Sequence, residues 1–132
     1  NSDVNENGDD YIMYCFHSVA GYSKFGTYPG TAYTDGAFIN TGFKPAWIMV
    51  KSITGAVDNW AIYDSARDTY NPRDSYIYGD DAQAEATYST ALVDFVSNGF
   101  KWRGAVNFGN NSSRRYAYAA FAEAPFKYAN AG

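Results

Sequence analysis

The chain has 132 residues, a net charge of −4 at pH 7 and an aromatic content of 19%. This length fits one domain, and the acidic charge with scattered Lys and Arg excludes the continuous basic surface that nucleic-acid binding requires. No apolar run reaches the roughly 18 residues of a membrane-spanning helix, so no membrane insertion is expected. The single cysteine, Cys15, excludes an intrachain disulfide.

The composition favours strands over helices. The 13 Tyr, 9 Phe, 3 Trp and 12 Gly are typical of pleated sheets and tight turns, whereas helical domains are built on Leu, Ala, Glu and Lys. Residues 1–10 read as an acidic, flexible lead-in, and residues 21–36 and 79–90 as loops. Short apolar or alternating runs predict eight strands. In chain order these are residues 11–16, 37–41, 46–51, 59–64, 75–78, 91–96, 99–103 and 115–124.

The strand pattern predicts one all-β domain over residues 11–132. Asn98-Gly99 between two apolar runs is a strong hairpin signal, and short strands separated by turns are typical of a sandwich. We therefore expect an antiparallel β-sandwich or jelly roll. The predicted core residues are Ile12, Tyr14, Phe16, Trp47, Ile48, Val50, Trp60, Ile62, Phe95, Phe100, Tyr118 and Phe121.

The two ends of the chain share a sequence pattern. Residues 7–16 read NGDDYIMYCF and residues 112–121 read SSRRYAYAAF, so that Tyr11 and Tyr116 lie 105 positions apart. One interpretation is that two strands met similar packing demands. The other is a piece of a tandem array, in which residues 11–20 form a strand equivalent to 116–125 of a preceding unit. Such a strand would link subunits by adding to an open sheet edge, through the assembly residues Tyr11, Ile12, Tyr14 and Phe16.

No catalytic constellation stands out, and we expect no enzyme. Cys15 and His17 share one face of a predicted strand, but no third group is placed to orient them as a catalytic pair. Asp64 and Asp68 lie in an Asp- and Arg-rich segment, residues 63–74. Paired carboxylates serve glycosidases, but salt bridges within a loop are the commoner use of such residues.

We also expect no metal cofactor. Asp3, Asn5 and Asn7 begin like a calcium-binding loop, but the twelfth position holds Tyr14 where such loops carry a bidentate Glu. Calcium near Asp3, Asn5, Asn7 and Asp9 is the alternative.

The segment 21–36 supplies the candidate ligand-binding residues. Tyr22, Phe25, Tyr28 and Tyr33 alternate there with Gly, Thr and Asp, and rings among small polar residues suit sugar stacking or protein contact. The alternative is that these rings cover one end of the sandwich.

A further motif concerns modification. Asn110 and Asn111 each begin an Asn-x-Ser sequon in a predicted hairpin tip. The sequence leaves open whether either is glycosylated.

Five blocks of the sequence resemble a domain of bacteriophage virion proteins, associated with tails and fibres and found beside lectin-like units. The blocks are YIMYCFHSVAGYSKFGTY, DGAFINTGFKPAWIMVK, WAIYDSARDTYNP, DFVSNGFK and YAYAAFAEAPFKY, between residues 11 and 128. The resemblance implies a sandwich of lectin-like type, similar to concanavalin or SPRY domains. It also implies a structural role in a virion or extracellular appendage, with glycan or host-surface binding as a companion role. It implies no catalytic residues.

Together these observations predict a structural subunit that assembles with itself through homotypic β-strand contacts, into an oligomer or filament. Its expected partners are other copies, other virion proteins and surface glycans, and its expected location is a virion or the extracellular space. The alternative function is a carbohydrate-binding adhesion module that attaches to a host surface.

Overall fold

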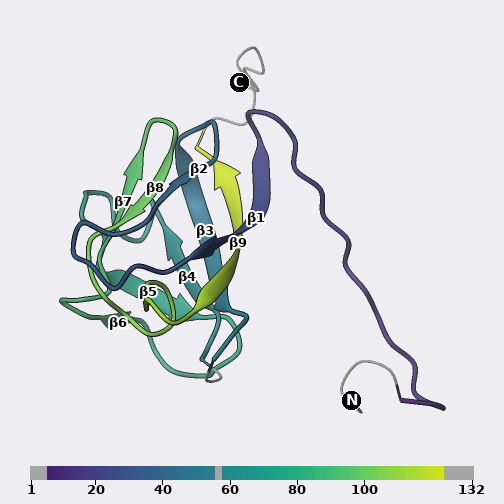
Figure 1. Ribbon diagram of the computed structural model, residues 1–132. Helices are drawn as coiled ribbons and strands as arrows, with labels where there is room; N and C mark the ends of the chain where they lie inside the picture. The colour runs from purple at the N-terminus through teal and green to yellow at the C-terminus, as the bar shows by residue number, and fades with distance from the viewer. Residues whose placement is uncertain (1–5, 56–57, 124–132) are drawn as a thin grey trace.

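The computed structural model describes residues 6–55 and 58–123, which form nine strands and no helix (Figure 1). These residues therefore contain no helix that could cross a membrane. The strands are β1 (Ser23–Pro29), β2 (Phe38–Asn40), β3 (Pro45–Ser52), β4 (Ala61–Asp64), β5 (Ser75–Tyr78), β6 (Ala86–Thr87), β7 (Val93–Val96), β8 (Gly99–Trp102) and β9 (Arg115–Ala122).

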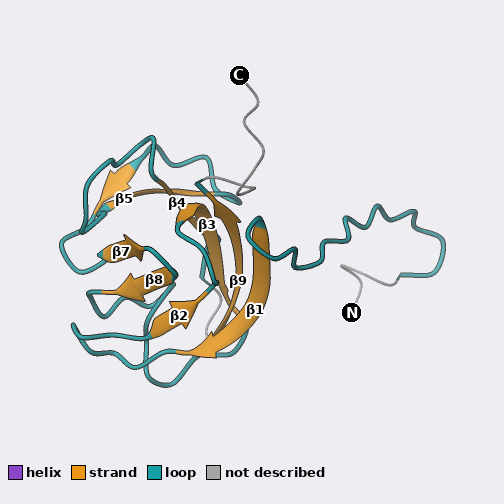
Figure 2. Ribbon diagram, turned by 90° about the horizontal axis from the view of Figure 1, so that it is seen from above, coloured by secondary structure: helices purple, strands orange, loops and turns teal. Residues whose placement is uncertain are grey.

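The strands form two antiparallel sheets that face each other. The larger sheet has six strands in the order β1-β9-β3-β4-β5-β6, and the smaller has three in the order β2-β8-β7. Figure 2 shows the large sheet curving around the small one. The all-β prediction is thus confirmed, and the two layers are compatible with the predicted sandwich. β9 lies in the interior of the large sheet, whereas β1 is an edge strand with β9 on one side only.

The core between the sheets is built mainly from aromatic rings. Alternate residues of each strand point inward, and the fully buried side chains include Tyr63, Phe100, Trp102 and Tyr116. Burial raises the pKa of Tyr63 well above the usual tyrosine value. Its hydroxyl therefore stays protonated and donates to the carbonyl oxygen of Ala91 at 2.8 Å, which satisfies a polar group that would be costly to bury alone.

A buried hydrogen-bond chain joins the two sheets. Trp102 Nε1 on β8 donates to the hydroxyl of Tyr28 on β1 at 2.8 Å, and that hydroxyl donates to the carbonyl oxygen of Gly109 at 2.8 Å. Burial raises the pKa of Tyr28 well above its usual value, so the phenol remains a neutral donor. These two hydrogen bonds fix β1, β8 and the loop before β9 relative to one another.

The predicted hairpin at residues 97–99 is confirmed, with a register that the sequence did not specify. β7 and β8 pair with Val96 opposite Gly99, so Ser97 and Asn98 form the two-residue turn. Gly99 lies inside the strand, where an added Cβ would overlap the carbonyl oxygen of Ile39 on β2. The glycine is required there because the backbone of β2 passes close to it.

Several strand predictions are wrong at the N-terminal side. Residues 11–16, predicted as a strand, form none and are exposed. Residues 23–29, predicted within a loop, form β1 because the Gly and Pro residues that suggested a loop are tolerated on an edge strand. The short strand β6 was also missed.

The core prediction is correct for Ile48, Val50, Phe95, Phe100 and Tyr118, which are buried. It is wrong for the residues that are exposed or only partly buried. Strand alternation turns some of them to the far side of the large sheet, and the others lie outside the sheets. These are Ile12, Tyr14, Phe16, Trp47, Trp60, Ile62 and Phe121.

Asn110 is fully buried and uses its whole amide group to hold three segments together. Its Oδ1 accepts from the backbone N–H of Thr31 at 2.8 Å and from the Thr31 hydroxyl at 3.2 Å. Its Nδ2 donates to the carbonyl oxygens of Tyr33 and Gly104 at 3.1 and 2.9 Å. Because both amide hydrogens are engaged in the interior, the Asn110 side chain is not accessible to glycosylation in this fold. Asn111 is partly exposed.

We expect Asn110→Ala to lower the free energy of unfolding by about 3 kcal/mol, because several buried groups lose their partners. Asn111→Ala is the matched control, with an expected loss of about 1 kcal/mol or less since its side chain is partly hydrated. Urea denaturation followed by tryptophan fluorescence measures both. Equal losses in the two variants would contradict the role assigned to Asn110.

Candidate functional site

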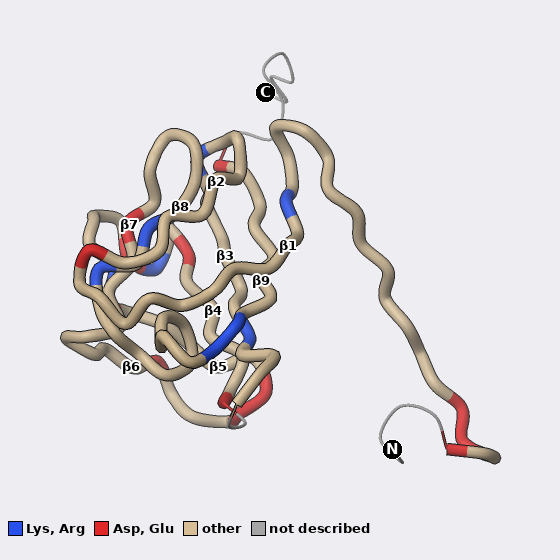
Figure 3. Tube along the Cα trace, viewed as in Figure 1, with Lys and Arg blue, Asp and Glu red and all other residues tan. Residues whose placement is uncertain are grey.

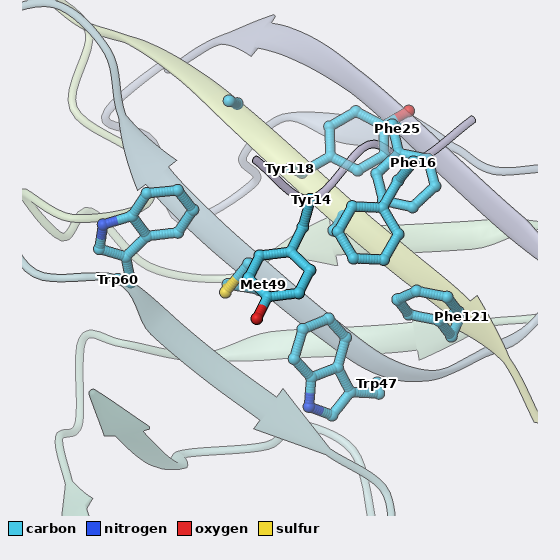
Figure 4. Close-up of a pocket in the computed structure, with 10 residues that line it drawn as sticks. Tyr14, Phe16, Phe25, Trp47, Met49, Trp60, Tyr118 and Phe121 are labelled. Carbon is cyan, nitrogen blue, oxygen red and sulfur yellow. The ribbon is translucent and has the colours of Figure 1, made fainter. Parts of the chain in front are cut away.

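The face of the large sheet that points away from the small sheet carries an apolar hollow of about 360 Å³. We call it the outer-face groove (Figure 4). The strand pairing explains its composition: Trp47 and Met49 on β3 lie opposite Phe121 and Ala119 on β9, and Ala119 lies opposite Phe25 on β1. The sheet residues that line the groove are Phe25, Trp47, Met49, Ala117, Tyr118, Ala119 and Phe121, joined by Trp60 from just before β4.

The groove offers packing surface without charge. None of the described residues that line it is Asp, Glu, Lys or Arg. The ring of Phe121 packs against Trp47 with centroids 5.6 Å apart and against Phe25 at 5.8 Å. Trp60 remains 39% exposed. A contiguous apolar surface of this kind is typical of an interaction site.

Residues 11–16, which we call the arm, carry apolar side chains into solvent. Exposed fractions run from 47% for Tyr11 to 84% for Ile12. Figures 1 and 2 show the arm leaving the body next to β1 and running away on the side of the outer face. Only its C-terminal part touches the groove: Tyr14 and Phe16 line the rim, and Phe16 stacks on Phe25 with ring centroids 5.6 Å apart.

The chain between the arm and β1 begins a hairpin that is not continued. Val19 and Ser23 exchange backbone hydrogen bonds of 3.0 and 2.9 Å, and Ser18 Oγ accepts from the N–H of Phe25 at 3.0 Å. Among the described residues, no backbone hydrogen bond joins the arm itself to β1. The edge of β1 between Phe25 and Pro29 therefore has no strand beside it within this part of the chain, and such an edge is a template for strand addition.

Charge is distributed unevenly around the arm and the edge strand. The lead-in before the arm carries Glu6, Asp9 and Asp10, all exposed (Figure 3). Arg115, at the start of β9, lies opposite Pro29 at the end of β1, and its Nη2 donates to Thr27 Oγ1 at 3.2 Å. The edge of β1 thus ends beside a cation, while the arm begins beside anions.

The structure separates the four predicted ligand-binding residues. Tyr28 is buried in the core. Phe25 lies in the outer-face groove, and Tyr22 packs edge-on against Phe121 at 5.9 Å. Tyr33 is 70% exposed and lies near Asn110, away from that groove. The two residues that belong together are therefore Tyr22 and Phe25, at the groove.

The Asp- and Arg-rich segment 63–74 forms salt bridges and turns. Arg67 contacts Asp64 at 3.1 Å and also Glu85. Asp68 Oδ2 accepts from the backbone N–H groups of Asp74 at 2.8 Å and Ser75 at 3.3 Å. These contacts agree with the salt-bridge interpretation of the segment.

The remaining candidate residues are exposed or lie outside the described residues. Cys15 and His17 are both exposed. Asp3 and Asn5 of the alternative calcium site lie outside the described residues, while Asn7 and Asp9 are exposed. Residues 6–55 and 58–123 contain no group of three or more His, Cys, Asp or Glu side chains placed to hold a metal ion.

The outer-face groove was not predicted because Trp47, Trp60 and Phe121, which line it, were expected in the core. In 46–51 both faces are apolar, which is typical of a strand covered on both sides. In the described part of the chain, however, the second sheet covers only one side of this sheet (Figure 2). In 59–64 the larger residues Trp60 and Ile62 suggested the inward face, whereas Ala61 and Tyr63 occupy it. The sequence signal for the groove was that its strands carry large apolar side chains on both faces, although only one face packs against the second sheet.

Comparison with known proteins gives one match. A family model described as a domain of unknown function (DUF7483) matches residues 1–125. No curated protein matches the chain, and no solved structure matches it. Because the match spans nearly the whole sequence, the chain belongs to the DUF7483 family.

Proposed function

We propose that this domain is a self-assembling structural module in which the arm of one copy binds the outer-face groove and the open β1 edge of the next. The observation that supports this most is the coexistence of an exposed apolar arm and an uncharged apolar groove in the same chain. The location in a virion or extracellular appendage is part of the proposal and rests on the sequence resemblance. The jelly-roll or concanavalin-like type is likewise proposed, on the support of the curved six-stranded sheet.

The energetics favour a partner for the arm. Fully burying one large apolar side chain contributes about 1.5–3 kcal/mol, so burying Tyr14 and Phe16 more deeply together with Ile12 would contribute several kcal/mol. Association costs at least about 4 kcal/mol in lost translational and rotational freedom. A few side chains therefore barely offset that cost, and backbone pairing at the β1 edge would add to the contact.

The direction of the docked arm decides which cation its acidic end meets. An incoming arm that runs antiparallel to β1 has its N-terminal end at the Pro29 end of that strand. Its acidic N-terminal end, Asp9 and Asp10, then comes beside Arg115. The parallel direction would bring the same acidic end beside Lys24 at the start of β1. We favour the antiparallel direction because all the strand pairs in the described sheets are antiparallel.

The proposed contact is head-to-tail. The arm and the groove are different surfaces, so each copy can donate one arm and accept another, which generates a ring if the rotation closes and a filament if it does not. The sequence similarity between residues 7–16 and 112–121 fits this proposal, because 115–122 form β9, a strand of the very sheet that the arm would join.

We expect the double variant Ile12→Asp/Phe16→Asp to abolish assembly and leave the fold intact, because both side chains are largely exposed in the single copy. Light scattering and negative-stain electron microscopy should show rings or filaments for the unchanged chain and single copies for the variant. Tyr70→Asp is the matched control, since Tyr70 is 82% exposed but lies outside the arm and the groove. It should assemble normally.

Mixing a variant with a disabled arm and a variant with a disabled groove gives a sharper control for the head-to-tail arrangement. Trp60→Asp should disable the groove and leave the arm, so this variant alone should be a single copy. Combined with Ile12→Asp/Phe16→Asp, it should form a complex of two chains and nothing larger. Assembly of either variant by itself, or an unchanged chain that stays single at every concentration, would sink the proposal.

Charge reversal tests the direction of the arm. We expect Arg115→Glu to weaken assembly about 3- to 10-fold, and Asp9→Lys/Asp10→Lys to restore it in the same chain, because exposed ion pairs contribute at most about 1 kcal/mol each. Sedimentation at low and high salt measures the effect, which should shrink as salt rises. Lys24→Glu, at the other end of β1, is the control. A larger effect for Lys24→Glu than for Arg115→Glu would indicate the opposite direction.

The alternative function, a carbohydrate-binding adhesion module, needs a different surface from the one that the sequence analysis chose. Tyr28 is in the core and Tyr33 lies apart from Tyr22 and Phe25. Segment 21–36 therefore gives no cluster of four rings for a sugar.

A further inference from the structure

A second hollow, of about 440 Å³, opens between β5 and the loops on either side of β7 and β8. It shares no lining residue with the outer-face groove. Aromatic rings form much of it. Tyr76 and Phe108 are buried with centroids 4.9 Å apart, Tyr78 lies 5.8 Å from Phe108, and Tyr88 stands at the rim with 58% of its surface exposed. The volume is in the range of small-ligand sites.

The walls of this hollow are held in place by the fold. The carbonyl oxygen of Asn107 accepts from the hydroxyl of Tyr116 at 2.7 Å and from Arg114 Nη1 at 3.0 Å. The backbone of Thr90, which also lines the hollow, passes so close to Gly104 that an added Cβ on Gly104 would overlap the Thr90 carbonyl. The site is thus formed before any ligand arrives, which reduces the cost of binding.

The polar groups of the hollow carry no uncompensated charge. Among the described residues that line it, Asp58 is the one that carries a charge, and the guanidinium of Arg114 forms a salt bridge with that carboxylate. Burial raises the pKa of Tyr78 to about 12, so its hydroxyl stays neutral at physiological pH. Within the described residues the Nδ2 group of Asn107 has no hydrogen-bond partner, while its Oδ1 accepts from Asn111 at 3.0 Å.

We propose that this hollow binds a neutral pyranose residue of a glycan. A pyranose has an apolar face of C–H groups that stacks on a ring such as Tyr88, and hydroxyls that pair with neutral donors and acceptors such as Asn107 and Thr90. An anionic ligand would find no free cation among the described lining residues, because Arg114 is already paired with Asp58. A purely apolar ligand would displace water from the amide of Asn107 without replacing its hydrogen bonds. This inference goes beyond self-assembly and does not depend on it.

Saturation-transfer NMR on the full chain tests the proposal, because the sugar signals are observed whether or not the chain assembles. The probes are the methyl glycosides of glucose, galactose, mannose and N-acetylglucosamine. We expect at least one to bind with a millimolar dissociation constant. Tyr88→Ala should weaken that binding at least about tenfold, as the loss of a stacking ring does elsewhere.

Two exposed tyrosines outside the hollow provide the controls. Tyr70→Ala and Tyr33→Ala should each bind the same probe as the unchanged chain does. Absence of transfer to all four probes, binding that Tyr88→Ala leaves unchanged, or binding that Tyr33→Ala removes would each overturn the proposal. None of these results bears on the arm and the outer-face groove.

Discussion

The hydrogen-bond chain from Trp102 through Tyr28 to Gly109 is the constraint on which the rest of the molecule depends. It ties β8 of the small sheet to β1, the edge of the large sheet, and to the loop that leads into β9. All three partners are buried, so each hydrogen bond forms where water cannot replace it. The position of β1 follows from this contact, and with it the open edge and the point where the arm leaves the body.

The aromatic rings fall into two groups, one that packs the core and one that supports the proposed functions. The rings on the inner face, such as Tyr63 and Tyr116, are fully buried and pack the core. The remaining rings lie on the outer face, in the arm and in the hollow beside β5, where they are accessible. A chain with 19% aromatic residues has more rings than a core of this size encloses, and the surplus defines its two candidate contact surfaces.

Much of the fold was predictable because strand alternation and turn residues are local signals. The hairpin around Ser97 and Asn98 was found in this way, as was the apolar strand that became β3. The face that each residue occupies was not predictable, since alternation identifies two faces without saying which one is covered. Trp47 and Trp60 were assigned to the core on size alone, and the groove was missed for that reason.

The character of the arm was predictable from the sequence, but its exposure was not. The sequence singled out residues 11–16 as strand-like and as assembly residues, because they are apolar and resemble residues 116–121. The sequence did not indicate that these residues are exposed in the single chain. Their exposure depends on which strands pair with β1 and on which strand forms the edge of the sheet. The hollow beside β5 combines residues from four separate parts of the chain, and no local pattern brings Asp58, Tyr88 and Asn107 together.

Hydrogen exchange of the arm amides, measured at increasing protein concentration, tests the central claim most directly. In the single copy, the arm makes no backbone hydrogen bonds to β1, so its amides should exchange at nearly unprotected rates when the protein is dilute. The account predicts that residues 11–16 and the β1 edge become protected together as assembly proceeds. Assembly with an arm that stays unprotected would contradict the account and place the contact between copies elsewhere.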